Sequence, residues 1–315
     1  MSAVAARSLD LAPAASHEAF LHRGDEEFVE GAATFVRDGL ERGEPVLVMV
    51  TRRHRDQLRS ALRRDAAHVR FGDMEVVGAN PARIIPTWRA FVDEASPDGR
   101  PVRGIGEPIW PARRDPELAE CHVHESLLNR ALEGTALRLL CPYDVTGLGA
   151  DVVARAHRTH PLLTDGDAVR PSAHFEDDFH AVPPPDLQAP PPDAHTLRFE
   201  ADTLGAARRV VSSLAAHAGM RSPRIADLAM AANEAATNSV RHGGGVGTLL
   251  AWTEPDRVVC EVRDGGRIEE PLVGRIRPRG ASDARGLWLA NALCDLVQIR
   301  TGEQGSVVRL HMRRD

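Results

Sequence analysis

The chain has 315 residues, of which 43% are hydrophobic and 27% are charged, with a formal net charge of −6. This composition is ordinary for a globular protein and excludes fibrous and largely disordered architectures. All 39 basic residues are arginine, which excludes a Walker-type phosphate loop and a Schiff-base enzyme, because both depend on lysine. No apolar run approaches the roughly 18 residues of a membrane-spanning helix. The first twenty residues lack a secretory apolar segment, so we expect a cytoplasmic protein without a membrane partner.

A proline-rich run divides the chain. Residues 183–192 read PPPDLQAPPP, with six prolines in ten positions. Such a run favours extended polyproline geometry and is typical of a semi-rigid spacer. The sequence therefore predicts two domains, over residues 1–182 and 194–315, joined by a linker over 183–193. Neither half is strongly basic, so we expect no direct nucleic-acid partner.

The first half alternates helical and strand-like patterns in chain order. Apolar periodicity predicts helices over 25–43, 52–64, 81–95 and 117–132, and strands over 45–50, 68–74 and 137–143, and the segment PVRGIGEPIW (101–110) belongs to the same series. This alternation predicts an α/β domain with a mostly parallel sheet covered by helices. The turn after the strand 45–50 reads TRRHRDQL and contains neither glycine nor lysine. We therefore expect no nucleotide in this domain, and a purely structural α/β domain is the alternative to a ligand-binding one.

The cysteines give no sign of a compact metal or redox motif. They are Cys121, Cys141, Cys260 and Cys294, and none are paired at short spacing. In ECHVHES, Cys121 lies close to His122 and His124, which raises the question of metal ligation. Because no second cluster at ligand spacing supports it, the favoured interpretation is a helix with mixed polar and buried faces.

Several segments of the first half together resemble the MEDS domain, a bacterial sensory module. They are HEAFLHRGDEEFVEGAATFVRDGLERGEPVLVMVT, GIGEPIW, ECHVHESLLNRAL, LLCPYDVTGL and RTHPLL. The resemblance covers roughly residues 15–170. It implies that this half senses a small-molecule signal or a partner, and it names no catalytic residues.

The second half begins with a predicted strand over 196–202 and a helix over 204–219. Ser222 and Pro223 together predict the start of another helix, with the serine as its cap. Predicted strands follow over 247–253, 257–263, 295–301 and 306–312, with a helix from Gly286 between the second and third. The Gly-, Pro- and Arg-rich stretch 267–283 is expected to form a mobile lid whose arginines reach phosphate oxygens.

Polar residues recur on one face of the helix that starts near Ser222. Glu234 and Asn238 are four residues apart and therefore lie on the same side. Alone, this pattern is typical of a solvated face. The strand 257–263 is followed by Asp264-Gly265-Gly266, which alone is typical of a turn but also allows a carboxylate to enter a cleft beside a closely approaching backbone. The helix beginning at Gly286 presents free N–H groups suited to phosphate.

The ordered set of these motifs resembles the GHKL ATPase superfamily. NEAATNSVRHG is similar to its N box, RDGG to its first glycine box and ARGLWLANALCD to its second. Within that superfamily the segment 194–315 is similar to the anti-sigma factor serine kinases of the sigma-B and sporulation type. The resemblance implies an α+β ATP-binding sandwich of the Bergerat type, with ATP and Mg²⁺ as cofactors.

The resemblance also implies roles for individual residues. Glu234 matches the catalytic general base, and Asn238 matches the asparagine that holds magnesium. Asp264 matches the aspartate that accepts a hydrogen bond from the adenine amino group. The remaining cofactor-binding positions are the glycine against the base, the phosphate-contacting helix start and a hydroxyl that reaches adenine through water, namely Gly266, Arg285, Gly286, Leu287 and Ser306.

Two positions depart from the family pattern. The first glycine box lacks a further glycine, because Arg267 and Ile268 follow Gly266. The second box has Ala284 where the family has glycine, and alanine enters positive φ only with strain. These departures bear on lid closure and ATP affinity more than on the fold.

Three functions compete. In the first, the protein is a homodimeric protein serine/threonine kinase and anti-sigma factor that binds a sigma factor and phosphorylates a STAS-domain anti-anti-sigma protein. In the second, ATP only sets the conformation of a non-catalytic partner-binding module. The third is a sensor histidine kinase, which needs an acceptor histidine on a helical hairpin before the ATPase domain. His174 and His180 lie in a segment too short for that hairpin, and the acceptor-like pairs at His17 and His124 lie inside the sensory half.

Overall fold

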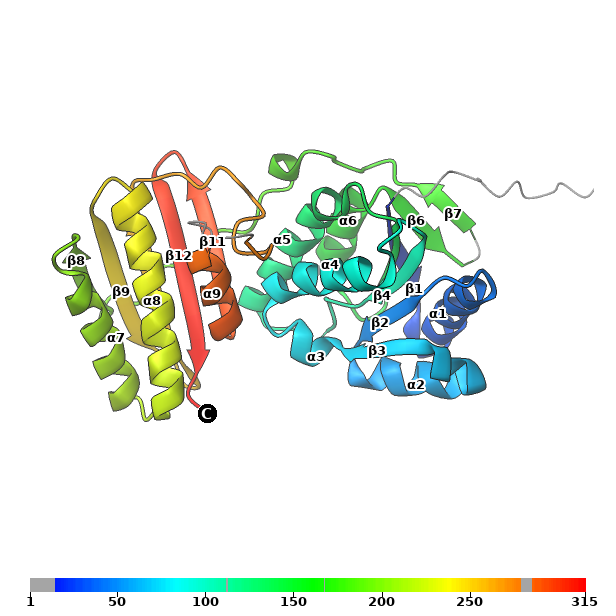
Figure 1. The fold of residues 1–315 in the computed structure, drawn as a ribbon, viewed down its shortest axis with the longest axis horizontal. Helices are drawn as coiled ribbons and strands as arrows, with labels where there is room; N and C mark the ends of the chain where they lie inside the picture. Colours follow the sequence, from blue (N-terminus) through cyan, green and yellow to red (C-terminus); the bar gives the residue numbers. More distant parts are fainter. Residues whose placement is uncertain (1–14, 112, 167, 279–284) are drawn as a thin grey trace, which may run out of the picture. The chain divides into compact units, whose positions relative to one another are not determined.

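The computed structural model describes residues 15–111, 113–166, 168–278 and 285–315. These residues form two compact units (Figure 1). The first unit holds the chain up to Gly72, Arg89–Glu107 and Leu128–Asp177. The second holds Asp73–Trp88, Pro108–Leu127 and Asp178–Asp315, so it includes two segments that precede the proline-rich run.

The sheet of the first unit has the strand order β3-β2-β4-β5-β1-β6-β7. Strands β2, β4, β5, β1 and β6 pair in parallel, and β7 pairs antiparallel with β6. The bounds are β1 Ser16–His22, β2 Val46–Val50, β3 Val69–Asp73, β4 Val102–Gly106, β5 Leu137–Asp144, β6 Leu162–Asp165 and β7 Ala168–Pro171. The predicted mostly parallel sheet is confirmed.

Helices alternate with these strands along the chain in the order that the sequence predicts, with additions. They are α1 Gly24–Glu41, α2 Arg52–Leu62, α3 Met74–Val77, α4 Ile84–Ala95, α5 Asp115–Leu132 and α6 Ala150–Thr159, with 3-10 turns at Arg63–His68 and Pro81–Arg83. Of these, α3, the turn at Pro81–Arg83 and most of α5 belong to the second unit. Helix α1 buries Phe28, Ala32 and Val36, whose spacing forms one apolar stripe. The sequence did not predict β1, α6, β6 or β7.

The second unit contains a five-stranded antiparallel sheet in the order β11-β12-β10-β9-β8. Its strands are β8 His195–Phe199, β9 Gly247–Thr253, β10 Arg257–Asp264, β11 Leu296–Gly302 and β12 Gly305–Arg313. Helices α7 (Leu204–His217), α8 (Ser222–His242) and α9 (Arg285–Leu293) cover one face of this sheet (Figure 1). The predicted α+β sandwich is confirmed.

Small side chains allow helix α8 to pack closely on this sheet. Its buried positions are mostly alanine, and Ala232 and Ala236 join a core that includes Val262 and Leu310 from the strands. The predicted serine cap of this helix is wrong. The cap residue is Arg221, no side-chain hydrogen bond caps the helix, and Ser222 is already helical. Proline at Pro223 occupies the first turn, as predicted.

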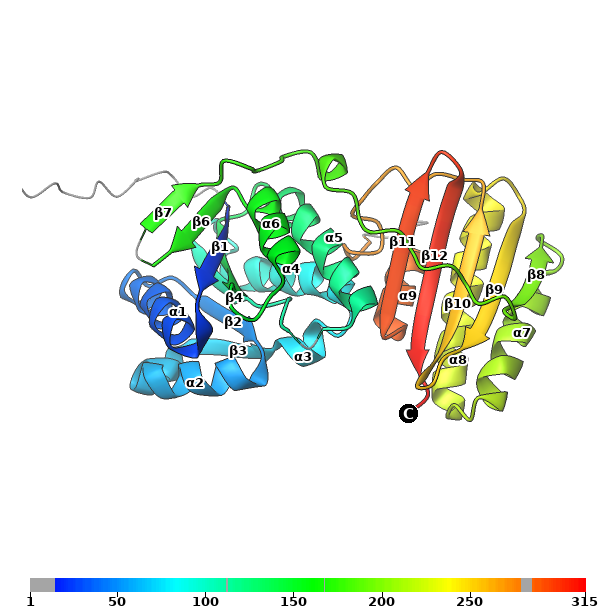
Figure 2. The same ribbon diagram turned by 180° about the vertical axis from the view of Figure 1, so that it is seen from behind.

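The proline-rich run crosses the face of the sheet opposite the helices (Figure 2). It has no helix or strand, in agreement with the expected extended geometry. It packs on the sheet, however, where a spacer was expected. Arg300 Nε donates to the Pro185 carbonyl at 2.9 Å, and Arg309 Nη2 donates to the Gln188 carbonyl at 2.7 Å. Carbonyl groups outside regular structure need such donors when they lie against protein.

Candidate functional site

Residues that the sequence singled out in the second half surround one cavity of about 200 Å³. Its lining includes Asn238, Asp264, Gly266, Leu287 and Ser306, which come from α8, the end of β10, α9 and β12. The walls combine apolar side chains with a few polar groups, as is usual for small-ligand sites. The structure thus brings together five predicted site residues that are far apart in the sequence.

Asp264 is held in a fixed orientation at the end of strand β10. The Ser239 hydroxyl donates to Asp264 Oδ2 at 2.6 Å, and the Gly266 N–H donates to Asp264 Oδ1 at 2.8 Å. An ionised carboxylate has about four acceptor positions, so these two bonds leave capacity for a ligand donor. The sequence did not single out Ser239, which is buried and directly follows Asn238 in helix α8.

Two glycines make room for this carboxylate. A Cβ atom at Gly243 would lie 2.4 Å from Asp264 Cγ, and one at Gly266 would lie 2.6 Å from the His242 carbonyl oxygen. Both distances are shorter than real Cβ contacts. The Asp-x-Gly pattern at the end of β10 and the glycine after helix α8 therefore have the same cause, which is the close approach of their two backbones.

Hydrogen bonds of Ser306 stabilise the turn that follows Asp264. Its hydroxyl donates to the Gly266 carbonyl at 2.9 Å and lies 3.0 Å from the Thr301 hydroxyl. The Thr301 hydroxyl in turn accepts from the Ile268 N–H at 3.0 Å. Strand pairing places Ser306 opposite Asp264. The predicted contact of Ser306 with adenine through water stays a prediction.

The predicted base and magnesium ligand meet the start of helix α9. A Cβ atom at Gly286 would lie 2.9 Å from Glu234 Oε2 and 3.2 Å from Asn238 Nδ2. The second residue of α9 therefore faces both side chains, which are half-buried. The first N–H groups of a helix lack intrahelical partners and carry partial positive charge. A carboxylate, an amide and a helix N-terminus suited to phosphate thus lie side by side, while Arg285 is exposed at the helix start.

The predicted lid differs from expectation. Residues 267–278 have no helix or strand, whereas the rest of the predicted lid and Ala284 lie outside the described residues. Arg267 lines the cavity. Arg275 is buried, and its Nη2 donates to Glu120 Oε2 at 2.9 Å, while Arg300 Nη1 donates to Glu120 Oε1 at 2.7 Å. The expectation that the lid arginines reach phosphate oxygens is therefore wrong for Arg275, because a buried carboxylate binds its charge.

Polar residues from an earlier segment of the second unit cap the other end of helix α9. Asn80 Nδ2 donates to the Asn291 carbonyl at 3.1 Å, and Arg83 donates to the Asn291 and Cys294 carbonyls at 2.9 Å and 2.7 Å. The last carbonyls of a helix have no intrahelical donors. These contacts therefore stabilise α9, and no pattern in the sequence revealed them.

Comparison with known families agrees with this geometry. A family model for MEDS, the methanogen/methylotroph DcmR sensory domain, matches residues 16–161, and a histidine kinase-like ATPase domain model matches residues 197–312. The chain joins a MEDS sensory domain to a histidine kinase-like ATPase domain. The ATPase match encloses every predicted site residue, from Glu234 to Ser306. A search of curated proteins finds no match.

Within the described residues, every helix is too short or too polar to cross a membrane.

In the MEDS domain, a carboxylate occupies the turn where a phosphate loop would lie. Glu107 Oε2 accepts from the Thr51 N–H at 2.8 Å and from the Thr51 hydroxyl at 3.0 Å, at the start of helix α2. Glu107 Oε1 lies 2.8 Å from His54 Nδ1. Burial alone lowers the pKa of His54, but the hydrogen bond and charge of Glu107, with Asp25, raise it above the ordinary value. The start of helix α2 is therefore already bonded to a carboxyl group, and the absence of nucleotide binding by this domain stays a prediction.

The Cys121 segment is helical. It lies in helix α5, and the Cys121 thiol donates to the Pro108 carbonyl at 3.2 Å. Burial raises the pKa of this thiol to about 12. His122 and His124 are also buried. The interpretation as a helix with buried and polar faces therefore agrees with the structure.

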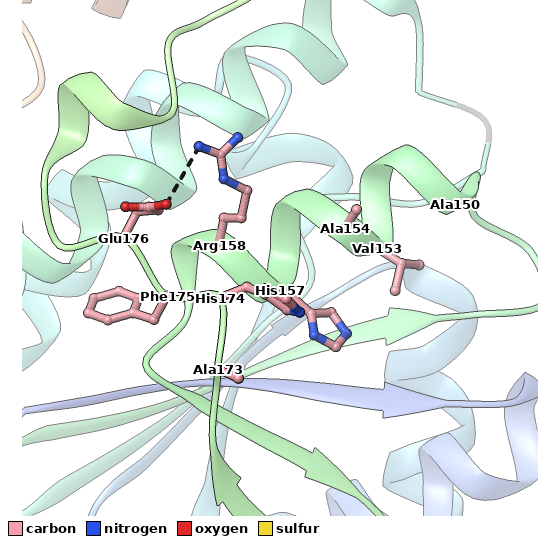
Figure 3. Close-up of a pocket in the computed structure, with 9 residues that line it drawn as sticks. All are labelled: Ala150, Val153, Ala154, His157, Arg158, Ala173, His174, Phe175 and Glu176. Carbon is pink, nitrogen blue, oxygen red and sulfur yellow. Dashed lines mark ion pairs between the residues drawn. The ribbon is translucent and has the colours of Figure 1, made fainter.

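A second cavity, of about 600 Å³, lies against helix α6 (Figure 3). Its lining comes from residues 150–158 and 173–176 and is mostly apolar. Arg158 and Glu176 form an ion pair at 3.9 Å. Burial, with the nearby charge of Arg170, lowers the pKa of His157, so its imidazole is neutral near pH 7. The cavity offers apolar walls with neutral and charged hydrogen-bonding groups.

Proposed function

We propose that this protein is a signal-responsive serine/threonine kinase and anti-sigma factor that uses ATP and Mg²⁺. The observation that carries the proposal is the meeting of Glu234 and Asn238 with Gly286 at the start of helix α9. A carboxylate beside a phosphate-binding helix end suits the transfer of a phosphoryl group to a hydroxyl. Asp264, across the cavity wall, suits recognition of a purine amino group.

The residues fit ATP and magnesium. At Gly286 and Gly266, the lack of a side chain leaves space beside polar groups, because a Cβ atom at either position would come within about 3 Å of a polar atom. Asn238 would hold Mg²⁺ through its amide oxygen, since magnesium prefers oxygen ligands. Magnesium neutralises charge on the phosphates during transfer. The free N–H groups at the start of α9 would bind phosphate oxygens, and Asp264 would accept from the adenine amino group.

Glu234 would act as the general base. It would accept the proton of a serine or threonine hydroxyl while that oxygen forms a bond to the γ-phosphorus. The bond from the γ-phosphorus to the bridging oxygen of ATP breaks, and ADP leaves. Arg267, at the cavity wall, would bind phosphate oxygens. The products are ADP and a phosphorylated partner.

The partners follow from the likeness of the N box and glycine boxes to those of anti-sigma serine kinases. We expect a sigma factor and a STAS-domain anti-anti-sigma protein, with the kinase acting as a homodimer. The MEDS domain would supply the signal, and the cavity beside α6 offers a place for a small molecule. These partner assignments are proposals, as is the location of the protein in the cytoplasm.

A non-catalytic binding module is the second candidate. The buried Glu120–Arg275 ion pair favours it, because it removes one lid arginine from the phosphates. In that function ATP binding would change the lid and so the affinity for a sigma factor. A histidine kinase fits less well, since His17 and His124, the acceptor-like histidines, are both buried.

Paired variants of helix α8 test the proposal. Glu234→Ala should lower phosphoryl transfer to a STAS partner by about 10²–10⁴-fold and leave ATP binding intact, because it removes only the base. Asn238→Ala should weaken Mg-dependent ATP binding itself. Asn233→Ala, on the same helix but outside the cavity lining, is the matched control and should change neither. If the unaltered protein transfers no γ-phosphate to any STAS protein yet holds a sigma factor only with ATP, the binding module is correct and the kinase proposal fails.

A further inference from the structure

Two histidines and a cysteine converge inside the MEDS domain. His17 lies on β1, Cys141 on the neighbouring strand β5, and His160 directly after α6 and before β6, which also pairs with β1. Register pairs Ala19 with Cys141 in the parallel ladder, so His17 and Cys141 share one face of the sheet. All three side chains are buried, with exposed fractions of 3% or less. Their ligand atoms lie within 4.8 Å of one another.

Hydrogen bonds fix the protonation of the His160 ring. His160 Nδ1 lies 2.8 Å from the Ala156 carbonyl oxygen. A carbonyl oxygen only accepts, so Nδ1 carries the proton and donates it. In the neutral ring, the lone pair is then on Nε2. Metal-binding histidines commonly show this arrangement, in which one nitrogen donates to a carbonyl and the other is presented to the metal.

The His17 ring is fixed in the same way through Asn129. Asn129 Nδ2 donates to the Thr159 carbonyl at 2.8 Å, which assigns the two ends of the amide. Asn129 Oδ1 therefore accepts from His17 Nδ1, at 3.2 Å. The lone pair of His17 is thus on Nε2, and that atom lies 3.4 Å from Cys141 Sγ.

The spacing suits a tetrahedral ion. With metal–sulfur and metal–nitrogen bonds of about 2.3 and 2.0–2.1 Å, sulfur and nitrogen ligands lie about 3.6 Å apart. The observed 3.4 Å between Cys141 Sγ and His17 Nε2 is close to that separation. We propose that His17, Cys141 and His160 form a buried binding site for a divalent transition-metal ion that takes thiolate and imidazole ligands, with Zn²⁺ as the probe. Such ligands bind zinc, whereas magnesium and calcium prefer oxygen.

A simple hydrogen bond between the thiol and His17 is the competing explanation. It accounts for one pair of atoms only. It does not account for the second imidazole, whose ring centroid lies 3.9 Å from that of His17, nor for two separate acceptors that set both rings in the same tautomer. Sequence spacing does not reveal this set, because His17 is more than a hundred residues from the other two and all three lie on different elements.

Metal titration of the full chain tests the proposal. The protein, stripped with a chelator under reducing conditions, should bind one Co²⁺ with a thiolate-to-cobalt charge-transfer band, and Zn²⁺ should abolish that band. Cys141→Ser should lose the band. Cys121→Ser, which also changes a buried thiol, is the matched control and should keep it. Absence of the band in the unaltered protein, or its persistence in Cys141→Ser, overturns the proposal.

Two further measurements do not depend on the cysteine variant. If Cys141→Ser does not fold, X-ray absorption of the zinc-loaded unaltered protein should show one sulfur and at least two nitrogen ligands, and a shell without sulfur overturns the site. Asn129→Ala should weaken Zn²⁺ binding by about 10–100-fold, as loss of an orienting partner typically does. Unchanged affinity in that variant would remove Asn129 as a positioning residue and with it the tautomer argument.

Discussion

Replacement of Asp264 by asparagine should separate nucleotide recognition from folding. The Gly266 N–H points at Oδ1 and cannot rotate, so the amide oxygen of Asp264→Asn would stay on that side. The amide nitrogen would then face the Ser239 hydroxyl, which can turn to accept. That hydroxyl also has an alternative acceptor in the Ala235 carbonyl, at 3.2 Å. The fold should therefore survive, while the cavity gains a donor where an acceptor is required.

The expected increase in the Kd for ATP follows from the hydrogen bond between Asp264 and adenine that the substitution removes. A hydrogen bond to a charged group contributes about 1.5–3 kcal/mol, which corresponds to an increase in Kd of about 10- to 160-fold. Isothermal titration of the full chain with ATP and Mg²⁺ measures it. Asp202→Asn, the same chemical change at an exposed turn, should leave the Kd unchanged. Equal Kd values for Asp264→Asn and the unaltered protein would remove this carboxylate from adenine recognition.

Three further perturbations have definite expected outcomes. Ser239→Ala should weaken ATP binding by about tenfold, because it removes a donor to the site carboxylate; titration calorimetry should detect this, and unchanged binding would show that the carboxylate needs no such support. Gly286→Ala should reduce phosphoryl transfer, since its methyl group displaces the glutamate and asparagine of helix α8, whereas Gly302→Ala, with no atom within 4 Å of its Cβ, should not. Because the pKa of His54 is raised in the folded state, its contribution to the free energy of unfolding is present below the unfolded pKa and is lost as the pH rises through the folded pKa. Chemical unfolding between about pH 5 and 8 should show that His54→Gln removes this pH dependence, and a parallel dependence in both proteins would contradict the role of Glu107.

Motifs with strong local periodicity were predictable from the sequence. Helices α1 and α8 and strands β2 and β10 appear close to the expected bounds, because each carries an apolar pattern that matches its period. The carboxylate and glycines at the end of β10 were also predictable, since they belong to an ordered set of boxes. At the end of β10, the local turn pattern and the resemblance to the ATPase family predict the same residues.

Strand β1 was not predictable from pattern alone. It lies between β5 and β6, yet it carries His17, Glu18 and His22, and all three are buried. Buried polar residues need partners, and these partners come from distant segments, such as Thr164, whose hydroxyl donates to Glu18. A strand that is stabilised by tertiary hydrogen bonds looks like a loop in the sequence.

Contacts near the proposed nucleotide site were hidden for a similar reason. The buried contact between Glu120 and Arg275 joins residues 155 positions apart, and nothing in either local sequence marks the pair. The proline-rich run likewise looked like a spacer because its carbonyl acceptors are not visible in the sequence, whereas the arginines that bind them lie on β11 and β12.

The central claim is that the cavity between α8, α9 and the end of β10 binds ATP with Mg²⁺. Calorimetric titration of the full chain, with and without Mg²⁺, tests it most directly. We expect one nucleotide per chain, with affinity that falls when Mg²⁺ is omitted and falls again in Asn238→Ala. No binding of ATP, or binding that neither Asn238→Ala nor Asp264→Asn changes, would contradict the account.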